Sequence, residues 1–326
     1  MSRAERRFHL VPEGPCIAVA ADPATLDDLG RYIAPCTAEA PPTWRVEAAW
    51  GDTAPTHGMA AGAFTTRDDE LDIVTRWRPA QRTITIHAGD GVPRYNLVQT
   101  IYAAGRTLLH AALGTAGPVR VVHGGAVSVG GNGVLLLGEK GAGKTTLTTA
   151  LLAEGADYIA SDRAFLRPDG GSLAIAGWVC TYRLDPGRLA PLLDHDALER
   201  VMKYVGEHRS DPEYSFGGKF RFPPRDLLRL CGFSEAPETP LACVVEITDP
   251  ARHGCVIESG TPDDLRAALK RHDVEPAIPP QLSPGRNPTT FPDDPGRLPF
   301  FRVAGRDSPR RMASALLDRI AMLPGP

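Results

Sequence analysis

The sequence predicts an α/β fold with a separate, smaller α+β domain at the N-terminus, and two observations support this. Val134–Leu137 is a short, all-apolar run, as expected for a strand covered on both faces, and apolar positions three and four apart follow it from residue 146 to residue 152. In contrast, the first 92 residues contain segments in which apolar and polar residues alternate, a pattern typical of strands buried on one face.

Composition limits the classes of protein that this chain can belong to. A length of 326 residues fits two domains or one large domain, and a net charge of −3 gives no reason to expect nucleic acid or an anionic membrane as a partner. The sequence has no apolar run of about 18 residues and no apolar segment after its basic N-terminus, so we expect neither a membrane span nor a secretory signal. The six cysteines form no C-x-x-C pair, which favours reduced thiols and a cytoplasmic location.

The predicted N-terminal domain consists mainly of strands, with a short helix after the first strand and a longer helix after the last. A short helix is predicted over residues 22–32, because Asp22 is a good cap and Pro23 fits the first helical position. A longer helix is predicted over residues 95–113, and the Gly- and Pro-containing residues 114–118 end it. We therefore predict an accessory domain over residues 1–115 and a second domain over residues 116–326. The predicted strands of the first domain are 16–20, 44–48, 70–77 and 83–87.

The predicted second domain alternates strands with a few helices. The sequence predicts a tight hairpin turn over residues 130–133 and a mobile loop over residues 206–218. The strands 241–247 and 255–258 are expected to pair with each other, and residues 275–299 are Pro-rich and irregular. The other predicted strands are 119–123, 126–129, 157–160, 164–166 and 177–184, and the later helices are 261–271 and 309–322.

The segment Gly138–Thr145 matches the G-x-x-x-x-G-K-[ST] phosphate loop in full. Glycines allow such a loop to curl so that backbone N–H groups point at a phosphate, and the helix that follows adds its positive end. Lys144 can reach the β- and γ-phosphates, and the Thr145 hydroxyl can bind Mg²⁺. The predicted nucleotide-binding residues are Gly138, Gly141, Ala142, Gly143, Lys144, Thr145 and Thr146.

A phosphoryl-transfer site also needs an acidic group near the metal ion. Asp162 ends a predicted strand one helix after Lys144, so we predict that it binds Mg²⁺ together with Thr145. The glycine-rich hairpin, the phosphate loop and the segment YIASDR, with His123 before them, resemble the HPr kinase/phosphorylase family, of the HPr-kinase/PEP-carboxykinase-like fold, and its smaller peptide-tailoring relatives. The resemblance is specific over residues 119–170.

This resemblance implies roles for particular residues. His123 would lie near the terminal phosphates of the nucleotide, and Asp162 matches the second acid of the family's acidic pair. The first acid, which in the family looks like the base acting on the acceptor hydroxyl, is replaced by Ser161, and a serine does not accept a proton near pH 7 as a carboxylate does. His123 is our candidate for the missing base, since histidine titrates in the required range.

Positive charge for the transition state is expected from a later segment. Gly217 and Gly218 precede two cations, and Lys219 or Arg221 could close over the γ-phosphate as part of a lid. The alternative is a solvated loop with two surface charges. Arg183 falls where the relatives often have a basic residue before a leucine.

Three functions remain open at this point. The first is a kinase that uses ATP and Mg²⁺ to phosphorylate a serine-type hydroxyl of a peptide, a small protein or a metabolite. The second, motivated by Ser161, is a non-catalytic nucleotide-binding protein that docks a biosynthetic partner. The third, ranked below both, is the reverse phosphatase or phosphorylase reaction. Sequence motifs of GTP-binding proteins, transporters and motor ATPases are absent. Relatives often form closed oligomers, so a homo-oligomer is also an expectation.

Overall fold

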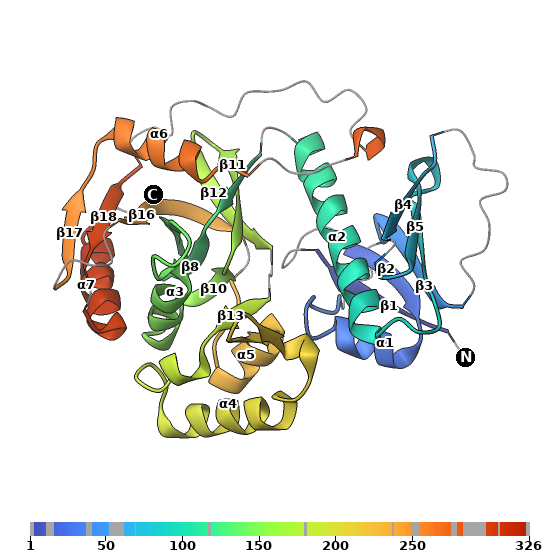
Figure 1. The fold of residues 1–326 in the computed structure, drawn as a ribbon. Helices are drawn as coiled ribbons and strands as arrows, with labels where there is room; N and C mark the ends of the chain where they lie inside the picture. Colours follow the sequence, from blue (N-terminus) through green and yellow to red (C-terminus); the bar gives the residue numbers. More distant parts are fainter. Residues whose placement is uncertain are drawn as a thin grey trace. The chain divides into compact units, whose positions relative to one another are not determined.

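The structure is a computed structural model of a mixed α/β protein (Figure 1). It describes residues 3–10, 16–36, 41–51, 62–68, 70–116, 119–178, 181–236, 238–248, 254–274, 279–282, 298–305 and 307–323. Its contacts divide the chain into two compact units, one of residues 1–117 with 276–288 and one of residues 118–275 with 289–326. The roles proposed above for residues 1–115 and 116–326 remain predictions.

The first unit is a sheet with two helices packed on it. The strands follow the order β1-β2-β3-β6-β5-β4, in which β2, β3 and β6 are parallel and the remaining neighbours are antiparallel. Helix α1 (Pro23–Leu29) packs on β2, and helix α2 (Arg94–Ala116) packs on β3 and β6. The strands are β1 (Ala4–His9), β2 (Cys16–Ala21), β3 (Trp44–Trp50), β4 (Phe64–Asp68), β5 (Ile73–Arg78) and β6 (Thr83–Ala88).

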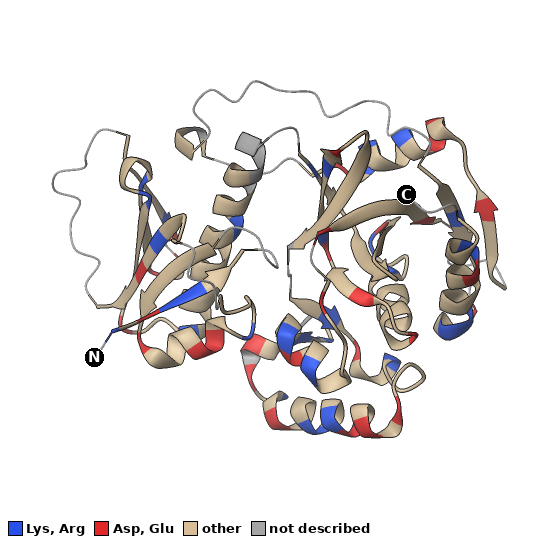
Figure 2. Cartoon of the chain, turned by 180° about the vertical axis from the view of Figure 1, so that it is seen from behind, with Lys and Arg blue, Asp and Glu red and all other residues tan. Residues whose placement is uncertain are grey.

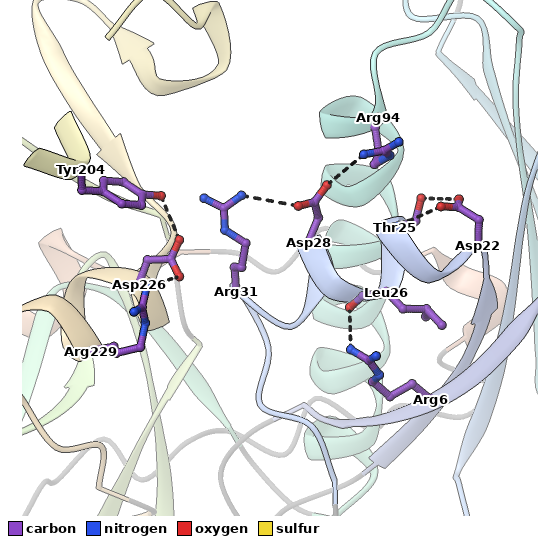
Figure 3. A network of polar contacts seen from close by, with 10 residues as sticks. All are labelled: Arg6, Asp22, Thr25, Leu26, Asp28, Arg31, Arg94, Tyr204, Asp226 and Arg229. Carbon is purple, nitrogen blue, oxygen red and sulfur yellow. Dashed lines mark hydrogen bonds and ion pairs between the residues drawn. The ribbon is translucent and has the colours of Figure 1, made fainter. Parts of the chain in front are cut away.

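Helix α1 begins as its sequence predicts. Pro23 occupies the first turn. The Asp22 carboxylate accepts hydrogen bonds from the Thr25 backbone N–H (3.0 Å) and hydroxyl (2.6 Å) (Figure 3). Hydrogen-bonded caps of this kind satisfy N–H groups that the helix itself leaves unpaired. Further along α1, Asp28 contacts Arg94 of α2 with 3.9 Å between Oδ2 and Nη1. These polar contacts hold α1 in place within the first unit.

The second unit is built around a large sheet with the strand order β10-β8-β9-β16-β12-β11-β7, to which β18 and β17 are added beyond β16. Strand β9 lies parallel to β16, and β16 lies parallel to β18. The strands are β7 (Arg120–His123), β8 (Gly125–Val129), β9 (Asn132–Gly138), β10 (Asp157–Ala160), β11 (Arg163–Asp169), β12 (Ser172–Trp178), β16 (Thr239–Ile247), β17 (Val256–Ser259) and β18 (Phe300–Ala304).

Strand β9 is buried on both faces, which confirms the prediction from its apolar run. Val134 and Leu136 belong to the core on the side of α3 (Lys144–Ala153) and α7 (Pro309–Ala321), two helices that lie side by side (Figure 1). Leu135 and Leu137 belong to the opposite core, on the side of α6 (Pro262–Arg271). Because helices cover both faces, the strand has no solvent-facing side and needs no polar alternation.

Helices α4 (His195–His208) and α5 (Pro224–Cys231) were not predicted, and the expected loop over residues 206–218 is structured. This stretch holds the end of α4, a short 3-10 turn (Pro212–Tyr214) and strand β14 (Ser215–Phe216). Aromatic contacts explain the difference, since Tyr204 of α4 packs against the rings of Tyr214 and Phe220. Tyr204 also donates a hydrogen bond of 2.8 Å to Asp226 of α5 (Figure 3). The many charged residues on the outer face of α4 therefore gave no sign in the sequence of its well-packed inner face.

The expected pairing of β16 with β17 is wrong, and the predicted strand 177–184 lies only partly within the described residues. Strands β16 and β17 do not pair with each other, because β18 lies between them and pairs with both. The predicted strand 177–184 contains the end of β12 and a separate strand β13 (Tyr182–Leu184). Residues 179–180, including Cys180, lie outside the described residues, as does most of the Pro-rich stretch 275–299.

Charges of both signs are interspersed on the second unit, and acidic and basic segments alternate along α4 (Figure 2). This distribution agrees with the small net charge of −3. Within the described part of the chain, no helix has both the length and the apolar character needed to cross a bilayer.

Candidate functional site

The loop between β9 and α3 has the conformation that its glycines permit. Gly138, at the end of β9, has a φ of +151°, and a Cβ atom there would lie 2.9 Å from the carbonyl oxygen of Ile247. Gly143 has a φ of +104° and immediately precedes the first residue of α3. Both positions favour glycine, because side chains are strained or obstructed there. We call residues Gly138–Thr145 the glycine loop.

The glycine loop is wrapped around the ammonium group of Lys144. Its Nζ donates hydrogen bonds to the carbonyl oxygens of Gly138 (2.6 Å) and Glu139 (3.2 Å), and the residue is only 8% exposed. Burial lowers the pKa of Lys144, and the negative charges of Asp162 and Glu139 oppose this. The two carboxylates thus favour the protonated form of Lys144.

His123 and Asp162 come together because the strands that carry them are neighbours. His123 ends β7 and is opposite Arg163 in β11, while the Gly124 N–H donates to the Asp162 carbonyl oxygen (3.0 Å). Nδ1 of His123 consequently lies 3.4 Å from Oδ1 of Asp162, and both side chains are partly exposed. Burial lowers the pKa of His123; Asp162 raises it, and Lys144 and Arg163 lower it further. A neutral imidazole oriented by a carboxylate can accept a proton at its other nitrogen. We call His123, Lys144 and Asp162 the reaction edge.

Ser161 is buried in the protein interior, with only 7% of its surface exposed. Its Oγ accepts a hydrogen bond of 3.2 Å from the hydroxyl of Tyr158, which is itself 1% exposed. A serine hydroxyl engaged in this way fills a structural position, and it does not supply the proton acceptor that a carboxylate there would provide.

The segment with the predicted lid cations forms a small sheet in the order β13-β15-β14, with β15 spanning Lys219–Phe222. Gly217 and Gly218 turn the chain between β14 and β15, with φ values of +55° and +77°. Arg183 of β13 is directly opposite Arg221 of β15, so the two side chains lie on the same face. Lys219 lies two residues before Arg221 and belongs to this face too.

The small sheet is fastened to α3 by a buried hydrogen bond. The hydroxyl groups of Thr149 and Tyr182 are 3.2 Å apart, and Tyr182 has no exposed surface. Because the Thr149 hydroxyl donates to the Thr145 carbonyl oxygen (2.8 Å), we assign the Tyr182 hydroxyl as donor to Thr149. Burial raises the pKa of Tyr182, so its hydroxyl keeps its proton.

A cavity of about 350 Å³ lies between α3 and the small sheet. Thr145 and Thr146 line it on one side, and Arg183, Leu189 and Lys219 line it on the other. We call it the α3 cavity. Of the two predicted lid cations, Lys219 reaches the α3 cavity, and Arg221 is not among the residues that line it.

One buried acidic residue near the glycine loop was not singled out from the sequence. Glu246 of β16 is opposite Leu137 of β9 and is 5% exposed. Its Oε1 accepts a hydrogen bond from Arg271 (2.6 Å) and lies 3.6 Å from Nε2 of His272. The His272 carbonyl oxygen in turn accepts the His123 N–H (2.7 Å). A single glutamate in an otherwise apolar strand is a signal that could have identified this residue.

The predicted metal ligands suit Mg²⁺, which binds proteins through one or two oxygen ligands and keeps phosphate oxygens and water as the others. Asp162 offers a carboxylate and Thr145 a hydroxyl. Among the described residues no group of three or more His, Cys, Asp or Glu side chains is placed to hold a metal ion by itself. One carboxylate and one hydroxyl fit a Mg²⁺ ion whose remaining ligands come mainly from a bound nucleotide.

No family model matches the sequence, and no curated protein matches it either. Among solved structures, the chain is similar to the Hpr(Ser) kinase/phosphatase from Coxiella burnetii, with 11% identity and a TM-score of 0.33. The match covers 62% of this chain and 88% of that protein. This is a distant structural likeness, and at this TM-score it supports no argument about activity or substrate.

Proposed function

We propose that the chain binds Mg²⁺-ATP at the glycine loop and transfers the γ-phosphate to a serine-type hydroxyl of a peptide, small protein or metabolite. One observation carries the proposal: the reaction edge lies beside a glycine loop of phosphate-binding sequence, with Nδ1 of His123 3.4 Å from Asp162. The three groups are a phosphate-binding cation, a carboxylate and a proton acceptor, which are the groups that such a transfer requires.

In the proposed reaction His123 takes the proton of the acceptor hydroxyl, while Asp162 keeps the imidazole oriented. The acceptor oxygen forms a bond to the γ-phosphorus, the bond from this phosphorus to the bridging oxygen breaks, and ADP leaves. Lys144 stabilises the negative charge on the phosphate oxygens. When bound, Mg²⁺ supplies additional positive charge at the phosphates, and Thr145 and Asp162 would hold it.

The second candidate is a nucleotide-binding protein without catalytic activity, and the position of Ser161 favours it. Its hydroxyl is buried against Tyr158, so it does not replace the carboxylate that is missing there. In this case nucleotide occupancy would control the affinity for a partner, and His123 would be a hydrogen-bonded strand residue.

The two candidates differ in whether a phosphorylated product forms. We would incubate the purified protein and Mg²⁺-ATP with a pool of serine-containing peptides and small proteins, and follow ADP release and product mass. A kinase consumes ATP only with its acceptor and adds one phosphate to it. ATP binding at micromolar strength without a phosphorylated product would overturn the kinase and leave the binding protein.

A further inference from the structure

The α3 cavity adjoins the reaction edge through the glycine loop, yet different residues form it. Its wall on the α3 side is made by Thr145, Thr146 and Thr149, which occupy the first two turns of the helix. His123, Lys144 and Asp162 are not among its lining residues. Gly141 and Thr145 belong to both the glycine loop and the lining of the cavity, so a ligand bound at the loop can extend into the cavity.

The direction of a nucleotide across the glycine loop follows from its sequence. In loops of this type the lysine reaches the β- and γ-phosphates, and backbone N–H groups hold the α- and β-phosphates. The γ-phosphate consequently lies at Lys144 and the reaction edge. Thr146 and Thr149 follow the loop directly and line the cavity, which puts the cavity within reach of the α-phosphate and the nucleoside attached to it.

The chemistry of the α3 cavity suits a nucleoside. Leu184, Leu189 and Leu192 provide an apolar wall for the face of a base. Arg183, Arg188, Lys219 and Asp185 add charged groups to the lining that can contact the sugar or the polar edge of a base. A volume of about 350 Å³ falls within the range of about 300–1,000 Å³ that small-molecule sites occupy. The acceptor hydroxyl is unsuited to this cavity, because it must attack the γ-phosphorus from the side opposite to the leaving ADP.

We propose that the α3 cavity is the nucleoside subsite and that Leu189 forms its apolar wall. This inference rests on the proposed nucleotide binding at the glycine loop. It also assigns Arg183 and Lys219 to the nucleoside end of the ligand, in place of the lid over the γ-phosphate that the sequence suggested for Lys219.

The test compares the affinities of Mg²⁺-ATP and Mg²⁺-tripolyphosphate, which share the phosphate chain but differ in the nucleoside. In the wild-type protein ATP is expected to bind at least about tenfold more tightly. Leu189→Ala should weaken ATP binding by about five- to tenfold and leave tripolyphosphate binding unchanged. The matched control is Leu193→Ala, since Leu193 is also buried in the same segment and does not line the cavity. It should change neither affinity, and circular dichroism checks the fold of both variants.

Equal affinities of the wild-type protein for ATP and tripolyphosphate would overturn the nucleoside subsite and leave the phosphate site intact. An equal loss for both ligands in Leu189→Ala, or the same selective loss of ATP binding in Leu193→Ala, would also overturn it. Binding of neither ligand would overturn the proposed function itself. As a second measurement, an azidoadenine analogue of ATP should label residues 183–192 or 217–219 on irradiation, and labelling confined to other segments contradicts the proposal.

Discussion

The reaction edge and the α3 cavity hold their charged groups in different ways. Lys144 is buried among backbone carbonyl groups, and His123 and Asp162 are fixed by the pairing of β7 with β11. Arg183 and Lys219 are exposed cations on the small sheet. Groups that interact with one another and are at least partly buried are suited to chemistry, because their pKa values can be shifted, whereas exposed charges mainly attract and position a ligand.

This difference predicts that substitutions at the reaction edge change turnover and that substitutions around the α3 cavity change affinity. The largest effect is expected for Asp162→Asn, which removes both the proposed metal ligand and the carboxylate partner of His123. Transfer should fall by about a thousandfold or more, measured as phosphorylated product per minute. Asp169→Asn, at the exposed end of β11, is the matched control and should behave as wild type. Full Mg²⁺-dependent activity in Asp162→Asn would show that the site is wrongly assigned.

His123→Ala should lower turnover by about a hundredfold or more without weakening ATP binding, because a general base contributes to the chemical step. The control is His195→Ala at the exposed start of α4. A turnover equal to that of the wild-type protein would exclude His123 as the base.

The pH profile of the wild-type protein checks the same role. Burial lowers the pKa of His123, and the imidazole must be neutral to accept a proton. Turnover should therefore be constant above neutral pH and fall as the pH decreases, with a midpoint below the ordinary histidine value of about 6.5. A midpoint well above that value would contradict the predicted direction of the shift.

A smaller effect is expected for Lys219→Ala, which removes an exposed cation from the α3 cavity. Affinity for ATP should fall by about two- to fivefold, with turnover at saturating ATP unchanged, because exposed ion pairs contribute little. Lys203→Ala, on the exposed side of α4, is the control and should change neither quantity. A large loss of turnover with unchanged affinity would instead support the lid role over the γ-phosphate.

The smallest effect is expected for Tyr182→Phe, which removes the hydrogen bond between the small sheet and α3. The free energy of unfolding should fall by about 1 kcal/mol, because Thr149 keeps its bond to the Thr145 carbonyl oxygen. Urea unfolding measures this change. If stability is unchanged while ATP affinity falls strongly, the bond serves the ligand site and has little structural role.

The elements near the glycine loop could be predicted because their signals are local. The apolar run of β9 and the glycines at 138 and 143 each determine the structure of the residues beside them. The motif likewise predicts a phosphate-binding role for Lys144 without any knowledge of the fold. Local backbone requirements of this kind are visible within a few residues of sequence.

The remaining features depend on contacts between distant segments. The sequence predicted a mobile loop over residues 206–218 and did not indicate helix α4, whose inner face is completed by Tyr214 and Phe220 from later in the chain. The insertion of β18 between β16 and β17 joins segments more than forty residues apart in the chain. The α3 cavity and the position of Glu246 likewise follow from strand pairing, which a single sequence does not show.

The central claim is that the glycine loop and the reaction edge form one phosphate-transfer site. The most direct test uses two lysines of the same loop: Lys144, which is buried, and Lys140, which is exposed. Each is changed to alanine, and mass spectrometry follows phosphate transfer from Mg²⁺-ATP to the acceptor pool. We predict that Lys144→Ala abolishes the product and that Lys140→Ala retains it. A phosphorylated product formed equally well by both variants would contradict this account.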